Sequence, residues 1–176
     1  LAGTWVAQDR LAEYAARPLW PEVGTRAGNA EQGGMQFGWR ETVTGTPAGT
    51  SLVVRGGPAG VGGNLDVLWL GADRDAILGP VSFFGQAADN DFAYYYDYLN
   101  PAPQTYTFLT EPAAPTAQRV KRPGLAPFTC HGGGQIVFYA PLVGGSHVDV
   151  QAVPASMSLN MVASEGDVVT LGSLAP

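Results

Sequence analysis

Two short runs in the sequence bring together residue types that can carry out nucleophilic chemistry. Cys130 is followed by His131 and three glycines, which offer either a thiol beside its base or a His-Gly-Gly-Gly oxyanion loop like that of some esterases. Adjacent side chains on an extended segment point in opposite directions, and the chain lacks the Gly-x-Ser-x-Gly turn that such esterases need. The run is better explained as a glycine-rich lead into a strand over 135–140.

A second run places the residue types of a hydrolytic triad together. Ser146, His147 and Asp149 lie within four positions, whereas triads are assembled from distant parts of a fold. His147 and Asp149 would share one face of a strand, where they could bind a metal ion. Solvated polar positions of a loop and a strand explain the run better. The sequence therefore predicts no enzyme, no catalytic residue, no assigned metal site and no cofactor.

Carboxylates that could bind calcium are the third kind of chemistry on offer. Asp89, Asp91 and Asp97 supply oxygen ligands of the kind that Ca²⁺ prefers, but the spacing and glycine of a helix–loop–helix calcium site are missing. They are named as candidates only. The aromatic residues among them are more often core or interface than a ligand platform, although a carbohydrate-binding module would also use exposed tyrosines.

The charge of the chain limits its partners. The formal net charge is −6 with nine Lys plus Arg, which is too little positive charge to hold nucleic acid through its phosphates. This argues against direct binding to DNA or RNA. The basic cluster Arg119, Lys121 and Arg122 lies in a proline-rich stretch over 111–127. There it is either solvated or in contact with an acidic partner or a nucleic acid.

Cysteine content and hydropathy bear on the compartment. Cys130 is the single cysteine, so an intrachain disulfide is impossible, and no Cys/His cluster has zinc spacing. This is typical of a reducing compartment. No apolar run approaches the roughly 18 to 20 residues of a membrane span, and we expect none.

Glycine and proline punctuate the chain and favour short strands over long helices. The sequence contains 24 Gly and 14 Pro. One short helix is predicted over 4–17, because Thr4 can cap it and Pro18 ends it. About seven or eight short strands indicate a single all-β domain over 1–176, with a helix and loop over 1–35 and a β-sandwich over 36–176. Alternation predicts strands over 37–43, 51–55, 65–70, 106–108, 135–140, 148–153 and 157–163, with a closing segment that runs to Leu171.

The order of these segments resembles that of a known protein family. The quoted features are a helix ending in Arg17-Pro18-Leu19-Trp20, a glycine loop between two strands within 51–70, an aromatic-proline step at Tyr139-Ala140-Pro141, and the pair Gly166-Asp167 before a final apolar stretch. Together they resemble the eight-stranded jelly-roll coat proteins of picorna-like viruses. The similarity covers about two-thirds of the chain as a pattern.

The resemblance implies an eight-stranded antiparallel jelly-roll β-sandwich with one short helix near the N-terminus. It also implies a structural capsid protein of a non-enveloped RNA virus, which assembles into an icosahedral shell. Partners would be other capsid subunits, self or sister coat proteins, and a host receptor, with at most weak or indirect contact with genomic RNA. The location would be the virion, assembled in the host cytoplasm. Two sheets would bury Leu65, Val67, Trp69, Phe138, Leu159 and Met161. Interface candidates are Trp20, Tyr94, Tyr95, Tyr96, Tyr98, Arg119, Lys121 and Arg122.

Three alternatives belong to other classes. One is a β-sandwich binding module, either lectin-like or a trimeric ligand of the C1q or tumour-necrosis-factor shape. Another is a phage decoration or tail protein. The third is a cupin-like enzyme that uses His147, but a chain with two histidines supplies few of the further metal ligands such a site needs.

Overall fold

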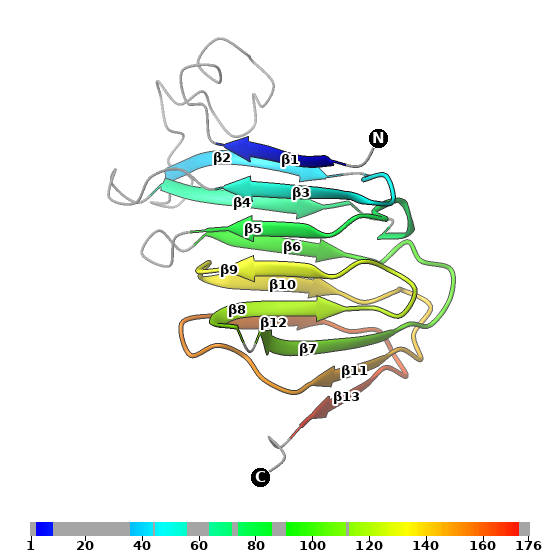
Figure 1. Ribbon diagram of the computed structural model, residues 1–176. Coiled ribbons are helices and arrows are strands. Elements are labelled where there is room, and N and C mark those ends of the chain that lie inside the picture. Colours follow the sequence, from blue (N-terminus) through cyan, green and yellow to red (C-terminus); the bar gives the residue numbers. More distant parts are fainter. Residues whose placement is uncertain are drawn as a thin grey trace.

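The computed structural model arranges most of the described chain as β-strands in two layers (Figure 1). The described residues are 3–8, 36–43, 45–55, 64–71, 74–85, 91–111 and 113–172. Within them the one helical element is the short 3₁₀ helix η1 (Arg74–Ala76). None of the described helical structure is long and apolar enough to cross a membrane. The all-β fold class with two sheets, predicted from the sequence, is confirmed.

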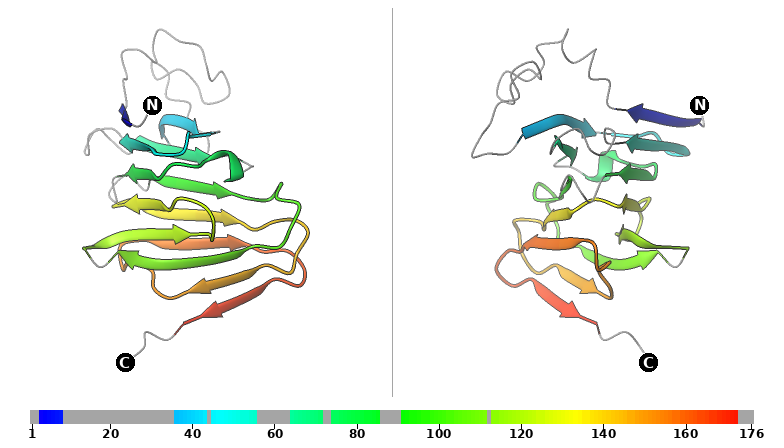
Figure 2. Two further views of the ribbon diagram at one scale, coloured as in Figure 1. Left: turned by 45° about the vertical axis from the view of Figure 1, so that its right-hand side comes forward. Right: turned by 90° about the vertical axis from the view of Figure 1, so that its left-hand side faces the viewer.

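Eight strands form one sheet and five form the other, and the two layers separate in the right-hand view of Figure 2. In spatial order the eight-stranded sheet contains β1 (Gly3–Gln8), β3 (Thr50–Arg55), β5 (Val81–Phe84), β9 (Phe128–His131), β8 (Ala114–Lys121), β7 (Thr105–Glu111), β11 (His147–Val150) and β13 (Val168–Leu171). The five-stranded sheet contains β12 (Ser158–Val162), β10 (Gln135–Tyr139), β6 (Phe92–Tyr96), β4 (Asn64–Leu70) and β2 (Gln36–Val43).

The chain crosses from one sheet to the other after almost every strand. From β1 to β7, and again from β9 to β13, consecutive strands belong to different sheets. Six of the eleven pairs of neighbours among the described strands are joined through a single strand of the opposite layer, and this connection brings them together in parallel. Nine of the eleven pairings between described strands are parallel.

Antiparallel pairing is confined, among the described strands, to β7, β8 and β9. The prediction of an antiparallel sandwich is thus wrong for the other pairings. The prediction failed because period-two alternation indicates which face of a strand is buried. It does not indicate which strand lies next to it or in which direction that strand runs. Most connections carry the chain across to the other sheet instead of reversing it within one sheet.

The N-terminal helix predicted over 4–17 is wrong where the structure describes it. Residues 4–8 belong to β1, which pairs in parallel with β3. Residues 9–17 lie outside the described residues, as does Trp20. A capping residue and a helical spacing are weak signals when pairing with a sheet edge competes with them.

The core between the sheets is rich in aromatic rings. The Tyr95 ring of β6 lies 5.7 Å from the Phe138 ring of β10 and 6.2 Å from the Phe128 ring of β9. The Tyr106 ring of β7 lies 4.7 Å from that of Phe138 in an edge-to-face arrangement. Full burial of a large apolar side chain stabilises a fold by about 1.5–3 kcal/mol. These rings therefore join the two layers where the extra hairpin strands β8 and β9 widen one of them.

The predicted core residues are placed correctly in part. Phe138 lies in the core, and Leu159 and Met161 pack against it while staying partly exposed. Val67 is buried but does not belong to the core cluster. Trp69 is only partly buried, and its neighbours Leu68 and Leu70 enter the core. On β4 the predicted inward face, with Val67 and Trp69, was therefore one residue out of register. The side chain of Leu65 lies outside the described ones.

Candidate functional site

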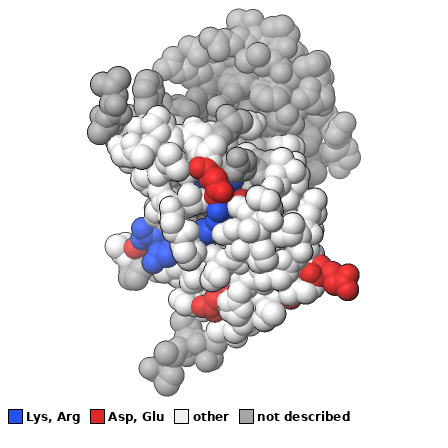
Figure 3. All heavy atoms as spheres, turned by 90° about the vertical axis from the view of Figure 1, so that its right-hand side faces the viewer, with Lys and Arg blue, Asp and Glu red and all other residues white. Residues whose placement is uncertain are grey.

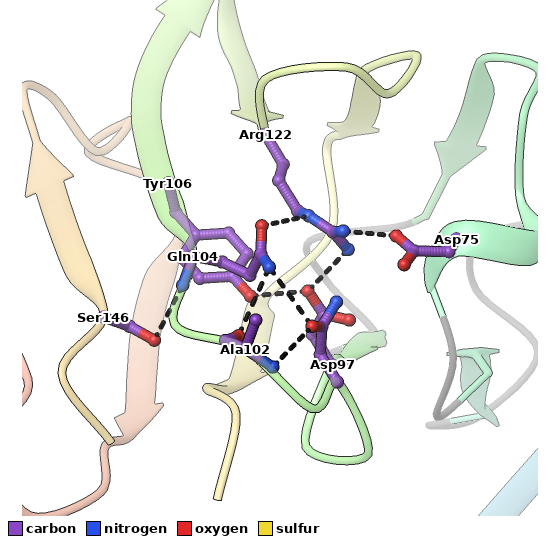
Figure 4. Close-up of polar contacts among 8 residues, drawn as sticks. Asp75, Asp97, Ala102, Gln104, Tyr106, Arg122 and Ser146 are labelled. Carbon is purple, nitrogen blue, oxygen red and sulfur yellow. Dashed lines mark hydrogen bonds and ion pairs between the residues drawn. The ribbon is translucent and has the colours of Figure 1, made fainter. Parts of the chain in front are cut away.

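Polar side chains from successive connections meet along the edge of the molecule that lies at the right in Figure 1. The connections are those between β4 and β5, β6 and β7, β8 and β9, β10 and β11, and β12 and β13. Hydrogen bonds and ion pairs join them into a row that we call the polar seam (Figure 4). Its members are Asp75, Asp97, Asn100, Gln104, Tyr106, Arg122, Ser146 and Asp167.

Arg122 is the centre of the seam. Its Nη1 donates to Asp97 Oδ2 at 2.9 Å, its Nε donates to Gln104 Oε1 at 3.1 Å, and its Nη2 pairs with Asp75 Oδ1. A turn positions it: Leu125 N donates to Arg122 O at 3.2 Å across Pro123 and Gly124, and Gly124 has a φ of 82°. Proline followed by a glycine with positive φ is typical of a type II turn. The sequence Arg-Pro-Gly-Leu therefore aims the guanidinium back between the sheets.

Asp97 is fully buried and holds the seam to β7. Its Oδ2 accepts a hydrogen bond from the Tyr106 hydroxyl at 2.5 Å as well as the bond from Arg122. Burial raises the pKa of Asp97, opposed by the Tyr106 hydrogen bond and the Arg122 charge. The pKa of Tyr106 is also raised, first by burial and then by its bond to Asp97. Burial works against the charge on Arg122, but its carboxylate partners raise its pKa overall.

Several buried polar atoms beside this cluster have no hydrogen-bond partner among the described residues. They are Oδ1 of Asp97, Nδ2 of Asn100, and Nε and Nη1 of Arg74. The Arg74 guanidinium lies over the Tyr95 ring at 4.5 Å, so its charge is balanced in part by a cation–π contact. Such groups are expensive to bury. Burial of these unpaired polar atoms beside the polar seam therefore carries a cost in desolvation free energy.

A second carboxylate, Asp167, ties the last two connections together. Its Oδ1 accepts from Ser146 N and its Oδ2 from Ser164 N, both at 2.7 Å. Gly144, with a φ of 70°, approaches so closely that a Cβ there would lie 2.0 Å from the carbonyl oxygen of Glu165. Gly166 and Asp167 were quoted from the sequence as part of a family pattern. In the structure the Asp167 carboxylate joins the loop that contains Ser146 to the loop that contains Ser164.

The predicted basic cluster is divided between two environments. A groove of about 420 Å³ is lined by Arg119, Lys121, Arg122 and the turn that follows them. Lys121 is exposed, whereas Arg119 pairs with Glu111 at 2.6 Å. The Arg122 side chain is only 6% exposed and pairs with two carboxylates. Figure 3 shows Lys and Arg gathered at one side of this end of the molecule, with Asp and Glu in separate spots. The predicted interface role therefore does not hold for Arg122.

The calcium candidates are not brought together. Asp91 precedes β6 and Asp97 follows it, so the extended strand separates them by roughly 20 Å. Asp91 Oδ1 accepts from Asp66 N at 2.9 Å. Asp89 lies outside the described residues. Among the residues that are described, no group of three or more His, Cys, Asp and Glu could hold a metal ion.

The two nucleophile-containing runs are also separated by the fold. Cys130 is fully buried, and burial raises the pKa of its thiol to about 12. His131 lies on the opposite face of β9, where its ring stacks on Phe84 at 4.1 Å. Ser146 is buried while His147 is exposed. Neither run assembles a thiol or a hydroxyl beside a base.

The tyrosine cluster is divided between two faces of β6. Tyr95 points into the core and is 1% exposed, so it does not fit the predicted interface role. Tyr94 and Tyr96 are partly exposed on the outer face of the five-stranded sheet. There they contact Trp69 of β4, with ring centroids 5.2 and 5.6 Å away. Tyr98 lies beside Tyr96 at 5.6 Å.

The eight-stranded sheet ends in a strand that is exposed on both faces. All four residues of β13, Val168–Leu171, are exposed, and Leu171 reaches 75%. Within the described residues β13 pairs only with β11, and it lies beyond β12 in Figures 1 and 2. The polar seam was not foreseen from the sequence. The run Val-Val-Thr-Leu, with no charge and no proline, is the signal that marks the edge.

Comparison with known proteins gives one partial similarity. A family model described as type II secretion system (T2SS), protein I, matches residues 1–54. That range includes β1, β2 and most of β3, together with residues outside the described part. No curated protein and no solved structure matches the chain. The polar seam and the β13 edge therefore lie outside the range of that similarity.

Proposed function

We propose that this chain is a structural protein, a subunit that joins other subunits by adding one of their strands to the open edge of β13. The observation that carries the proposal is that β13 is exposed on both faces and, among the described strands, is paired along one edge only. A strand in this position presents unpaired backbone groups and apolar side chains together. Interactions of that kind give affinity without a catalytic residue.

The backbone of β13 indicates which residues would form the new pairing. Val168 N donates to Ser146 O at 2.8 Å and Gly172 N donates to Val150 O at 2.9 Å, both toward β11. Alternate residues of a strand face opposite sides of the sheet ladder. The amide groups of Val169 and Leu171 therefore face the open side, where they are available to a strand of another subunit.

The edge lacks the features that usually prevent such pairing. Natural edge strands carry lysine, proline, a bulge or an inward charge. β13 consists of Val168, Val169, Thr170 and Leu171, and no register shift interrupts its pairing with β11. β1 lies at the other edge of the same sheet and runs in the same direction as β13. A β1 edge of a second copy would therefore continue the sheet by parallel pairing.

Two kinds of assembly are compatible with such a subunit. The sequence resemblance favours an icosahedral capsid built from jelly-roll subunits, and the parallel pairing of most described strands counts against it. The match of residues 1–54 to type II secretion system (T2SS), protein I, favours a component of a secretion system. Closed particles of uniform size in electron micrographs would support the capsid. Co-purification with type II secretion proteins, identified by mass spectrometry, would support the second.

The edge proposal is tested by removing one outward amide. Val169→Pro deletes an N–H on the open side and leaves the bonds toward β11 in place. We expect light scattering and analytical ultracentrifugation to show complexes larger than a dimer for the natural chain. These should be lost in Val169→Pro, with an unchanged far-UV circular dichroism spectrum and melting temperature.

Two further variants distinguish pairing at the β13 edge from nonspecific hydrophobic association. Val169→Lys adds a charge at the edge, and Val153→Lys adds the same charge at an exposed valine in the connection between β11 and β12. Only Val169→Lys should dissociate the complexes. A natural chain that never exceeds a dimer, or equal effects of the two lysines, would contradict the proposal.

A further inference from the structure

Four strands of the five-stranded sheet, β4, β6, β10 and β12, share an outer face that is uncharged and aromatic. The strands β4, β6, β10 and β12 contain one charged residue, Asp66, which is 2% exposed. By contrast, the strands of the eight-stranded sheet carry Arg55, Glu111, Arg119, Lys121 and Asp149 at exposed or partly exposed positions. The edge strand of this sheet, β2, carries Arg40 and Glu41, so the charge-free area is that of the other four strands.

The composition of this face is that of a protein interface. We call it the aromatic face and define it by Trp69, Phe92, Tyr94, Tyr96, Tyr139 and Val162. Interface cores are enriched in tyrosine, tryptophan and phenylalanine and depleted in charge. Val162 is 47% exposed, and the aromatic members are partly exposed. The parallel register sets Trp69 beside Tyr94, and Tyr96 beside Tyr139, which is in turn beside Val162. The members therefore form one continuous patch.

The orientation of the rings distinguishes between a sugar and a protein as the occupant. Tyr94 and Tyr96 stack on each other at 5.5 Å with an interplanar angle of 11°. Tyr96 also contacts Tyr139 at 4.7 Å. A platform for a pyranose ring needs an aromatic ring lying flat with one face free. Here Tyr94 and Tyr96 each cover one face of the other, and Trp69 and Tyr139 contact them at tilted angles, which favours a protein over a sugar as the occupant.

We infer that the aromatic face is where a second copy of this chain docks, face to face, in a symmetric dimer. A face without charge meets its own copy without the repulsion that the acidic chain would otherwise impose. It also offers no charge pattern that would select a different, charged partner. A twofold contact places the same patch on both sides, and two sheets pack with their layers about 10 Å apart. The inference does not rest on the β13 edge, which belongs to the other sheet.

The size of the face sets the strength of the dimer. Four strands about 4.8 Å apart and five residues long cover roughly 20 Å by 17 Å. This is less than the area of about 800 Å² per partner that standard interfaces bury. The dimer is therefore weak, with a dissociation constant in the micromolar range or above.

The inference is tested by adding charge at an exposed position of the face that lies outside the ring stack. Asn160 is exposed on β12, beside Val137 of β10. Asn160→Lys should raise the dissociation constant at least tenfold in sedimentation equilibrium. The matched control is Thr105→Lys, at an exposed position of β7 in the other sheet, which should leave the constant unchanged. Both are made in the Val169→Pro chain, so that edge pairing cannot contribute.

The possible outcomes separate this inference from the proposed function. A concentration-dependent dimer in Val169→Pro that Asn160→Lys disrupts supports the aromatic face, whether or not edge pairing is found. A monomer at concentrations up to several hundred micromolar overturns it. So does a dimer that responds equally to both lysines. Binding of cello- or chito-oligosaccharides by the monomer, abolished by Asn160→Lys, would also overturn it and assign the face to glycans.

Discussion

Arg122 donates from Nη1 to Oδ2 of Asp97 across 2.9 Å, and both side chains are buried. Arg122 begins the connection that leads from β8 to β9, whereas Asp97 begins the one from β6 to β7. The pair lies where strands β8 and β9 are inserted between β5 and β7. This ion pair thus links the β6–β7 connection to the β8–β9 connection, where the regular alternation of strands between the two sheets is interrupted.

Arg122→Met should destabilise the protein strongly at neutral pH. The substitution keeps an apolar stem but leaves the buried Asp97 without its cation. Breaking a buried pair by removing one partner costs about 3–5 kcal/mol. Urea unfolding at pH 7 measures this change in the free energy of unfolding. Lys121→Met, at the exposed neighbouring position, is the control and should change it by less than about 0.5 kcal/mol.

Asp97→Asn should be milder, and its cost should depend on pH in one direction. Because burial raises the pKa of Asp97, the folded protein binds this proton more tightly than the unfolded chain does. The stability from Asp97 is then greatest below the unfolded pKa of about 3.9 and falls as pH rises through the higher folded pKa. The stability advantage of the natural chain over Asp97→Asn should shrink over this window. An advantage that grows with rising pH would refute a raised pKa.

The glycines at 144 and 124 offer a matched pair of backbone tests. Both have positive φ, 70° and 82°, but a Cβ at Gly144 would lie 2.0 Å from Glu165 O, whereas nothing lies within 4 Å of one at Gly124. Gly124→Ala should cost about 1–2 kcal/mol from the left-handed backbone alone. Gly144→Ala should cost more and speed hydrogen exchange at Ser146 N, which donates to Asp167. An equal loss in the free energy of unfolding for the two variants would mean that the backbone at Glu165 moves away from the new Cβ without destabilising the protein.

Cys130 should resist thiol reagents until the protein unfolds. It is fully buried, and burial raises its pKa to about 12. At pH 8 its thiolate fraction would be roughly a thousandfold below that of a free cysteine. Ellman's reagent should therefore detect no thiol in the native chain and one in denaturant. Rapid labelling of the native protein would show that β9 opens easily.

Strands could be predicted from the sequence where a compact apolar or β-branched run stands between glycine and proline turns. The strand predicted over 135–140 corresponds to β10, and the one over 51–55 to β3. β6 was missed because Phe92, Tyr94 and Tyr96 face outward while Ala93 and Tyr95 face inward. Both of its faces are apolar or aromatic, so no alternation is visible. The uncharged outer face that supports docking is therefore the same property that concealed the strand.

The polar seam could not be predicted because its partners are distant in the sequence. Arg122 and Asp97 are 25 residues apart, and Arg122 and Asp75 are 47 apart. β8, which ends beside Arg122, was assigned to a proline-rich loop because Pro115 lies within it. Proline is tolerated there at one end of the strand, where the register with β7 also shifts. Local propensity indicated a solvated basic loop. Pairing with the distant Asp75 and Asp97 instead buries the charge of Arg122.

The inserted pair of strands β8 and β9 makes the two layers unequal in length. Each added strand lengthens its sheet by about 4.8 Å, so the eight-stranded layer gains roughly 10 Å that the opposite layer does not match. β11 and β13 are displaced by this amount, and β13 overhangs beyond β12 (Figure 1). With no opposing layer, its inward side chains stay uncovered, and Leu171 is the most exposed of them. The mismatch between the layers, more than the composition of the last strand, leaves that strand bare.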